Sequence, residues 1–204
     1  MKVSSIAFSQ DDSALAVQAA HSPDAFVEIY RRYYTRVFNY VRYRCEDLET
    51  AEDLTAQIFE RLLTKIGSYC PERGPFNTWL FAIVRNEVSG QWRNAHRRLW
   101  VSIESLWRWP SQEANPEQAA IQTEAHADLL AAIQQLDERE RDLLGLKFSG
   151  RLTNRQIAEL TGLSESHVGV ILYRAIRQLR EEISGEEQAF ITALPAMEHS
   201  HERA

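Results

Sequence analysis

The sequence has little of the residues that break helices or cross-link small folds. Its 204 residues include only 8 glycines, 6 prolines and 2 cysteines. Scarce glycine and proline favour helices over a turn-rich sheet. Cys45 and Cys70 have no CxxC partner and no histidine at ligand spacing, which argues against a zinc site. The sequence alone leaves a single disulfide open, although two independent thiols are favoured.

Long apolar runs and a leader are also missing. No apolar stretch approaches the roughly 20 residues that a membrane helix needs, and residues 1–10 lack the basic-then-apolar order of a signal peptide. The hydrophobic fraction of 44% and charged fraction of 25% are typical of a folded soluble protein. We therefore expect an all-α protein that resides in the cytoplasm.

The sequence contains no recognisable catalytic constellation. Its 6 histidines are scattered, and no Ser/His/Asp set, HExxH motif or phosphate-binding glycine loop surrounds them. His199 and His201 could bind a metal ion, but an unstructured segment is favoured there. The sequence predicts a protein that is not an enzyme, with no metal, no cofactor and no small-molecule substrate.

Charge is segregated along the chain. The net charge of −6 argues at first against nucleic-acid binding. However, residues 46–60 hold six acids and no Lys or Arg, whereas 85–98 hold four arginines against one acid and 151–180 hold five against two. The sequence therefore predicts two basic surfaces and one acidic surface, which suits two DNA contacts and a separate basic protein partner.

Apolar residues spaced three and four apart predict three helices in the first half, at about 23–44, 48–66 and 77–98. Ser22 is the expected N-cap of the first helix, with Pro23 in its first turn. The side chains expected to point inward from the second and third helices are Leu54, Ile58, Phe59, Leu62, Leu63 and Ile66, then Trp79, Leu80, Ile83, Val84 and Val88.

The helical pattern stops between the two halves of the chain. Residues 99–125 contain two prolines and three tryptophans without sustained helical spacing, and the pattern resumes after them. The expected organisation is an N-terminal tail (1–22), a helical domain (23–98), a linker (99–125), a second helical domain (126–184) and a C-terminal tail (185–204). The fold class is thus two small helical domains joined by a linker.

A helix-turn-helix is expected between Thr153 and about Arg180. Thr153 and Gln156 fit a capping box, Gly162 suits the turn, and Ser164 can cap the second helix. Its inward residues are Val168, Ile171, Leu172, Ala175 and Leu179; its outer face carries Ser166, Gly169, Val170, Tyr173, Arg174 and Arg177. In such motifs the second helix meets base edges and flanking arginines hold phosphates. The competing interpretation is a helical hairpin that binds nothing.

Four motifs occur in a fixed order along the chain. They are Phe26 to Tyr34; Ala51 to Thr55 followed by Phe59; Phe76 to Leu80 followed by Arg85-Asn86; and the helix-turn-helix ending Tyr173-Arg174-Ala175. Together they resemble the extracytoplasmic-function sigma factors of the sigma-70 family. The resemblance covers roughly 24–182. It implies that the first domain opens the promoter −10 element, that the second reads the −35 element, and that core RNA polymerase performs the chemistry.

The resemblance also implies partners and site residues. The partners are core RNA polymerase (its β′ coiled coil and β flap), promoter DNA and an anti-sigma factor, with one copy of the chain in the holoenzyme. The polymerase contacts would be Glu52, Asp53, Gln57 and Glu60. The −10 contacts would be Phe76, Asn77, Thr78, Trp79, Arg85, Asn86, Arg93, Arg97 and Arg98, with the loop 74–77 as the pocket for a flipped base and Phe76 stacking on it. The −35 contacts would be Ser164, Ser166, His167, Gly169, Val170, Tyr173, Arg174 and Arg177.

The chain departs from the family pattern at two places. Ala56-Gln57 replaces the common Gln-Glu in the acidic helix, so polymerase binding would depend more on Asp53, Gln57 and Glu60. Gly169 and Val170 stand where relatives often carry Lys or Arg and Ser, and neither makes the bidentate guanine contact of arginine. Base reading would shift toward Ser166, His167, Tyr173 and Arg174, or toward methyl contacts and DNA shape.

Two points stay open on the sequence alone. Trp79 suits either the core or a DNA-facing position, and the arginines of 85–98 could be a solvated basic face.

A dimeric helix-turn-helix repressor or activator would also explain the C-terminal half of the chain. It would not explain the aromatic segment from Phe76 to Trp79 or the acidic helix.

Overall fold

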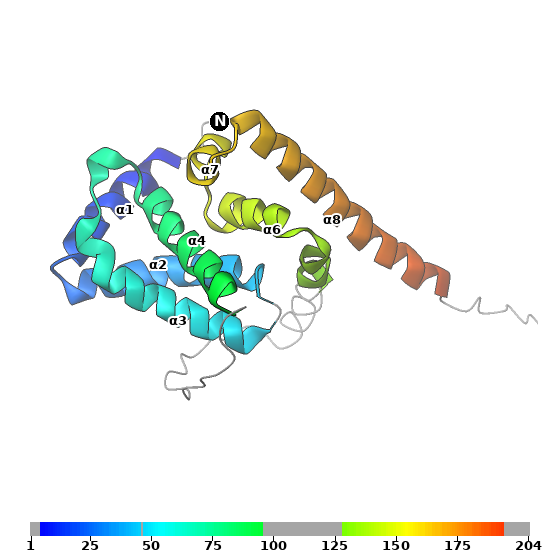
Figure 1. The fold of residues 1–204 in the computed structure, drawn as a ribbon, viewed down its shortest axis with the longest axis horizontal. Helices are drawn as coiled ribbons and strands as arrows, with labels where there is room; N and C mark the ends of the chain where they lie inside the picture. Colours follow the sequence, from blue (N-terminus) through cyan, green and yellow to red (C-terminus); the bar gives the residue numbers. More distant parts are fainter. Residues whose placement is uncertain (1–4, 46, 96–127, 194–204) are drawn as a thin grey trace, which may run out of the picture.

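The computed structural model describes residues 5–45, 47–95 and 128–193, and the side chains of 12–45, 47–90 and 128–183. Every regular element in these ranges is helical, which confirms the all-α expectation (Figure 1). The long helices are α1 (Ser5–Ala19), α2 (Pro23–Arg42), α3 (Leu48–Lys65), α4 (Phe76–Ala95) and α8 (Glu165–Ala193). The shorter elements are 3₁₀ turns at Ile66–Ser68 and Pro71–Arg73, a helix at 128–135, α6 (Glu138–Leu144), a π-helical turn at Gly145–Ser149 and α7 (Asn154–Thr161).

Helix starts follow the capping residues that the sequence supplies. Ser22 Oγ accepts a hydrogen bond from the Ala25 amide at 3.4 Å, with Pro23 in the first turn of α2. The carboxylate of Asp47 accepts from the Thr50 amide at 2.7 Å and starts α3. Each of these oxygens satisfies an amide that has no partner inside its own helix. Asp137 and Glu140 form a reciprocal capping box at α6.

The helices α2, α3 and α4 pack around an apolar core. Ile29 and Val37 from α2, Ile58 from α3, and Leu80 and Phe81 from α4 are all completely buried. The expected inward position of Leu63 is wrong, because its side chain is 57% exposed. Its neighbour Leu62 takes the inward position, and a rotation of about 100° per residue turns Leu63 toward solvent.

The N-terminal segment differs from the expected tail. It contains α1, in which Ala16 is fully buried and the Asp12 carboxylate accepts hydrogen bonds from Arg32 at 2.9 Å and the Tyr33 hydroxyl at 2.8 Å. This helix gave no periodic signal because its contacts with α2 depend on alanines and one carboxylate. The segment 185–204 also differs in part, since α8 continues to Ala193 and extends beyond the body of the protein (Figure 1).

The helix-turn-helix has the local chemistry that the sequence predicted. Thr153 and Gln156 form a reciprocal capping box at the start of α7. Gly162 ends this helix with φ of +75°, a conformation that glycine adopts without a Cβ penalty. Ser164 Oγ accepts from the His167 amide at 3.2 Å at the start of α8. Buried Ile157, Val168 and Ala175 hold the two helices together.

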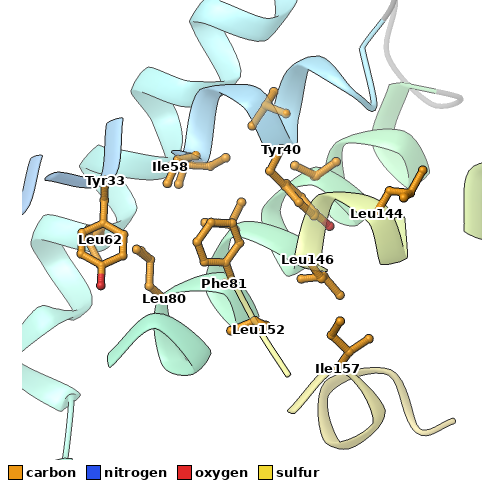
Figure 2. Packing of buried hydrophobic residues seen from close by; sticks show 14 of the residues in the cluster. Tyr33, Tyr40, Ile58, Leu62, Leu80, Phe81, Leu144, Leu146, Leu152 and Ile157 are labelled. Atoms are coloured by element: carbon orange, nitrogen blue, oxygen red, sulfur yellow. The ribbon is translucent and has the colours of Figure 1, made fainter. Parts of the chain in front are cut away.

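The two helical units share one continuous core. Tyr40 of α2 and Phe81 of α4 meet edge to face, with ring centroids 5.8 Å apart. Leu146 of the π-helical turn, Leu152 and Ile157 of the second unit belong to the same buried cluster (Figure 2). The domains expected on either side of the linker therefore pack directly against each other in this structure. Among the described helices, none combines the length and the apolar character needed to cross a membrane.

Candidate nucleic-acid interface

The outer face of α8 is a solvent-exposed surface with both apolar and basic side chains. Tyr173 is 68% exposed and Val170 is 46% exposed. The remaining residues expected to contact the −35 element, other than Gly169, are also exposed: Ser164, Ser166, His167, Arg174 and Arg177. Arg177 lies 3.4 Å from Glu181 in an exposed pair of the kind that contributes little to stability. The structure thus places this whole set on one accessible face.

Gly169 has no side chain, so a molecule that binds the outer face of α8 can approach the helix backbone closely at this position. It is half-buried, and a Cβ placed there would meet only Asn154 Nδ2 at 3.7 Å, an ordinary contact. Packing inside the protein therefore does not require glycine at this position. The missing side chain leaves Val170 and Tyr173 as the prominent apolar groups, which are suited to contact with a thymine methyl.

Phe76 belongs to the core and not to an exposed stacking platform. Its side chain is 1% exposed and meets Tyr33 and Tyr69 edge to face, each with ring centroids 5.3 Å away. The expected stacking of Phe76 on a flipped base is therefore not available in this structure. Trp79 is half-buried beside it, tilted against Tyr69 at 5.4 Å. Trp79 thus has both a core contact and an accessible part.

The polar side chains near this aromatic cluster differ in how many hydrogen bonds they make within the protein. Asn77 Oδ1 accepts from the Thr78 amide at 2.9 Å, while Nδ2 lies 3.5 Å from the Gly150 carbonyl of the second unit. The Thr78 hydroxyl is buried without a hydrogen-bond partner among the described residues. Asn86 is exposed. The side chains of Arg93, Arg97 and Arg98 lie outside the described residues.

Arg85 is bound to the second helical unit. Its Nε donates to Asp142 Oδ2 at 2.9 Å and its Nη1 donates to the Leu160 carbonyl at 3.2 Å. Partial burial acts to lower the pKa of Arg85, but the hydrogen bond and charge of Asp142, together with Tyr40, outweigh it and raise the pKa. The phosphate-binding role expected for Arg85 therefore requires that it leave Asp142.

The acidic surface of α3 is a stripe opposite the core. Glu52, Asp53, Gln57 and Glu60 are exposed, while Leu54 and Ile58 of the same helix are buried. Asp53, Gln57 and Glu60 follow each other at spacings of four and three, which puts them on one face. The structure thus brings together the four residues expected to contact the polymerase.

Sequence reasoning missed a set of charged residues between the two units: Arg36, Arg44 and Asp142, with Tyr40 beside them. Arg44 and Asp142 are only 2% and 7% exposed. Local pattern gave no signal for them, because charged side chains are normally solvated.

Comparison with known proteins identifies both units. The model for Sigma-70 region 2 matches residues 29–98, and the model for Sigma-70 region 4 matches residues 132–181. The ECF RNA polymerase sigma factor BldN of Streptomyces coelicolor is 31% identical over 160 residues, which cover 78% of this chain but 61% of BldN. RNA polymerase sigma factor YlaC of Bacillus subtilis is 28% identical over 166 residues, covering 79% of this chain and 93% of YlaC.

A solved structure shows a similar fold. The sigma factor RpoE from Bartonella quintana, in a co-crystal structure with the anti-sigma factor NepR, superposes with a TM-score of 0.59 at 21% sequence identity. The match covers 78% of this chain and 96% of that one. Both helical units and their order are therefore shared with a solved sigma factor.

Replacing Phe76 tests whether it is a core residue. We expect Phe76→Ala to lower the free energy of unfolding by about 3–5 kcal/mol, because it leaves a cavity among Tyr33, Tyr69 and Trp79. Asn77→Ala, one residue away and half-buried, is the matched control and should lower it by less than about 1 kcal/mol. Urea denaturation followed by circular dichroism measures both. Equal, small effects of the two substitutions would contradict the buried position of Phe76.

Proposed function

Because the chain belongs to the extracytoplasmic-function sigma factors of the sigma-70 family, which are transcription initiation factors and not enzymes, we propose that it directs core RNA polymerase to specific promoters. The outer face of α8 is the observation that carries this proposal. It presents Tyr173, Arg174 and Arg177 to solvent on the second helix of a correctly capped helix-turn-helix. This is the geometry with which such motifs enter a major groove.

Contact with the −35 element is the proposed role of region 4. Arg174 and Arg177 supply charge for phosphates, and the positive dipole end at the start of α8 favours an anion. Val170 and Tyr173 supply apolar and hydroxyl contacts to base edges. Recognition of bases then rests on thymine methyls and DNA shape more than on bidentate arginine contacts.

Contact with polymerase is the proposed role of the acidic stripe on α3. Glu52, Asp53 and Glu60 are exposed beside Gln57 on one face. A basic coiled coil, such as that of the polymerase β′ subunit, complements this face in charge. Complementary potentials of this kind accelerate association and exclude wrong partners. The β flap would contact region 4 in the same assembly.

Opening of the −10 element is the proposed role of region 2. Asn77 and Trp79 are partly exposed beside the aromatic cluster, the Thr78 hydroxyl is buried between them in sequence, and Arg85 and Asn86 follow on the same helix. Unpaired bases bind proteins by stacking on aromatic side chains, and cations follow the backbone. Trp79 takes the stacking role that the burial of Phe76 excludes. Arg93, Arg97 and Arg98 would extend the contact along the phosphates.

The remaining proposals concern regulation and location. The RpoE structure from Bartonella quintana contains an anti-sigma factor. We extend that kind of partner to this chain, which would act as one copy within the holoenzyme and reside in the cytoplasm with the polymerase. A second copy is not needed, because each chain carries its own region 2 and region 4.

Run-off transcription with purified core polymerase tests the function. We expect specific transcripts from a genome-wide template pool that core polymerase alone does not produce. The absence of any transcript that depends on this protein would refute the proposal.

A charge reversal in the stripe tests the polymerase contact. We expect Asp53→Arg to weaken binding to core polymerase on the order of tenfold, because it places a cation against a basic partner. Asp24→Arg is the control, since it reverses an exposed acid on α2 outside the stripe. Fluorescence anisotropy of labelled protein measures both affinities. Equal affinities for the two variants would place the polymerase contact elsewhere.

Removal of one guanidinium tests the −35 contact. We expect Arg174→Ala to weaken holoenzyme binding to −35 duplex DNA and to reduce the slope of log affinity against log salt by about 1, as loss of one phosphate contact does. Arg139→Ala, which removes an exposed arginine of α6, should leave both quantities unchanged. Footprinting and affinity measurements at several salt concentrations decide the point. An Arg174→Ala protein with wild-type affinity and slope would remove Arg174 from the interface.

A further inference from the structure

The helix α1 lies outside the segment that matches the family model. It spans Ser5–Ala19, whereas the Sigma-70 region 2 model begins at residue 29. It packs against α2 through buried alanines, and it also contacts α4 and the 3₁₀ turn at Ile66–Ser68 (Figure 1). Region 2 therefore has an additional helix beside the segment that joins α3 to α4, residues 66–75, called the α3–α4 connection below.

Asp12 of α1 holds a tyrosine on one side of Phe76. Its Oδ2 accepts a hydrogen bond from the Tyr33 hydroxyl at 2.8 Å, and its Oδ1 accepts one from Arg32 at 2.9 Å. Burial, and then the hydrogen bond to Asp12, raise the pKa of Tyr33, so its hydroxyl remains a donor. The Tyr33 ring meets Phe76 edge to face. Because Tyr33 is held at its hydroxyl, Asp12 fixes one side of the Phe76 ring.

The next residue, Ser13, contacts the tyrosine on the other side of Phe76. The Tyr69 hydroxyl lies 2.9 Å from Ser13 Oγ and 3.1 Å from the Gly74 carbonyl oxygen. A serine hydroxyl both donates and accepts, so Tyr69 can donate its one hydrogen to the carbonyl while it accepts from Ser13. Through Tyr69, Ser13 is linked to two points of the α3–α4 connection.

The backbone at Gly74 has an unusual conformation that packing does not impose. Its φ is +140°, which residues with a side chain rarely adopt, and a Cβ placed there would meet nothing within 4 Å. Glycine also has more conformational freedom to lose than any other residue. The hydrogen bond from Tyr69 to the Gly74 carbonyl therefore restrains a turn that is otherwise free to move.

The orientation of Trp79 depends on the same aromatic rings. Trp79 is half-buried, with its ring centroid 5.4 Å from that of Tyr69 and 5.7 Å from that of Phe76. Tyr33 and Tyr69, which contact α1, are both buried. A ring that is fixed before binding loses less conformational entropy when a base stacks on it. The accessible part of Trp79 is thus pre-oriented by contacts that begin at α1.

We propose that α1 is a positioning element of the −10 site. The Asp12 carboxylate acts through Tyr33. The Ser13 hydroxyl acts through Tyr69. Together they hold the α3–α4 connection and Trp79 in the orientation that binds an unpaired base. This inference rests on the proposed function, because the orientation of Trp79 matters only if region 2 opens the −10 element.

Hydrogen exchange in the free protein tests the restraint. We expect Ser13→Ala to speed amide exchange in peptides that cover 66–80 by about fivefold, because loss of one hydrogen bond makes local opening more frequent. Peptides of α3 should exchange at the wild-type rate. Gln18→Ala, an exposed position on α1, is the matched control and should change neither rate. Mass spectrometry measures the exchange, and wild-type rates over 66–80 in Ser13→Ala would overturn the proposal.

A double-mutant cycle tests the route through Tyr69. Tyr69→Phe removes the hydroxyl and keeps the ring against Phe76 and Trp79. In that background Ser13→Ala should cause no further increase in the exchange of 66–80, since the contact that it removes is already lost. Fully additive effects of the two substitutions would show that Ser13 does not act through Tyr69, contrary to the proposal.

Binding to promoter strands tests the role in recognition. The probes are the single-stranded non-template −10 segment and the duplex −35 segment of the promoter that gives the strongest transcript from the template pool. We expect holoenzyme with Ser13→Ala to bind the −10 strand about fivefold more weakly, and the −35 duplex with wild-type affinity. Ser13→Thr, which keeps the hydroxyl, should restore −10 binding, and Gln18→Ala should match wild type. Fluorescence anisotropy measures both affinities.

The outcomes separate the role of α1 from the proposed function. Equal losses on the two probes are what a general loss of stability produces, and they would overturn the positioning role. Unchanged −10 binding by Ser13→Ala holoenzyme would overturn it as well, while leaving the proposed function intact. Wild-type holoenzyme that binds no −10 strand would refute the proposed function, and with it the role of α1 in base binding.

Discussion

The position of one carboxylate fixes how the two halves of this protein meet. Asp142 is 7% exposed and carries a charge that the interior tolerates only with donors around it. Tyr40 and Arg85 donate to it from region 2, and the Arg44 guanidinium pairs with it as a cation at 3.1 Å. Because two hydrogen bonds and an ion pair converge on one group, a small rotation of α6 against region 2 would break several interactions at once. Apolar contacts alone would tolerate such a rotation more easily, since they are not directional.

The parts of the fold that were predictable depend on chemistry within a few residues. The capping box of Thr153 and Gln156, the positive φ of Gly162 and the cap of Ser164 each act over one helical turn, so the sequence contains all the partners. The 3.6-residue helical period then assigned the residues of α8 to a buried face and to an exposed face that carries Tyr173 and Arg174. The run of acids in 46–60 and the family resemblance, and not the helical period, pointed to Glu52, Asp53 and Glu60 on α3.

The parts that were not predictable depend on distant segments. Phe76 became a core residue because Tyr33 of α2 and Tyr69 meet its ring, and no local rule distinguishes that position from an exposed stacking platform. Arg85 bonds to Asp142, which lies 57 residues away in the sequence. The helix α1 lacks apolar periodicity, and its contact with α2 includes the two hydrogen bonds of Asp12.

Counting basic residues along the chain therefore overstates the charge that this conformation offers to DNA. Arg36 and Arg85 donate to carbonyls and a carboxylate of the protein itself, and Arg44 is buried beside the carboxylates of Glu138 and Asp142. The net charge of −6 and the exposed acids of α3 weaken long-range attraction to a polyanion further. Arg85 thus counts toward the basic segment 85–98 in the sequence but holds region 2 against region 4 in the structure, whereas Arg174 and Arg177 of the helix-turn-helix are exposed.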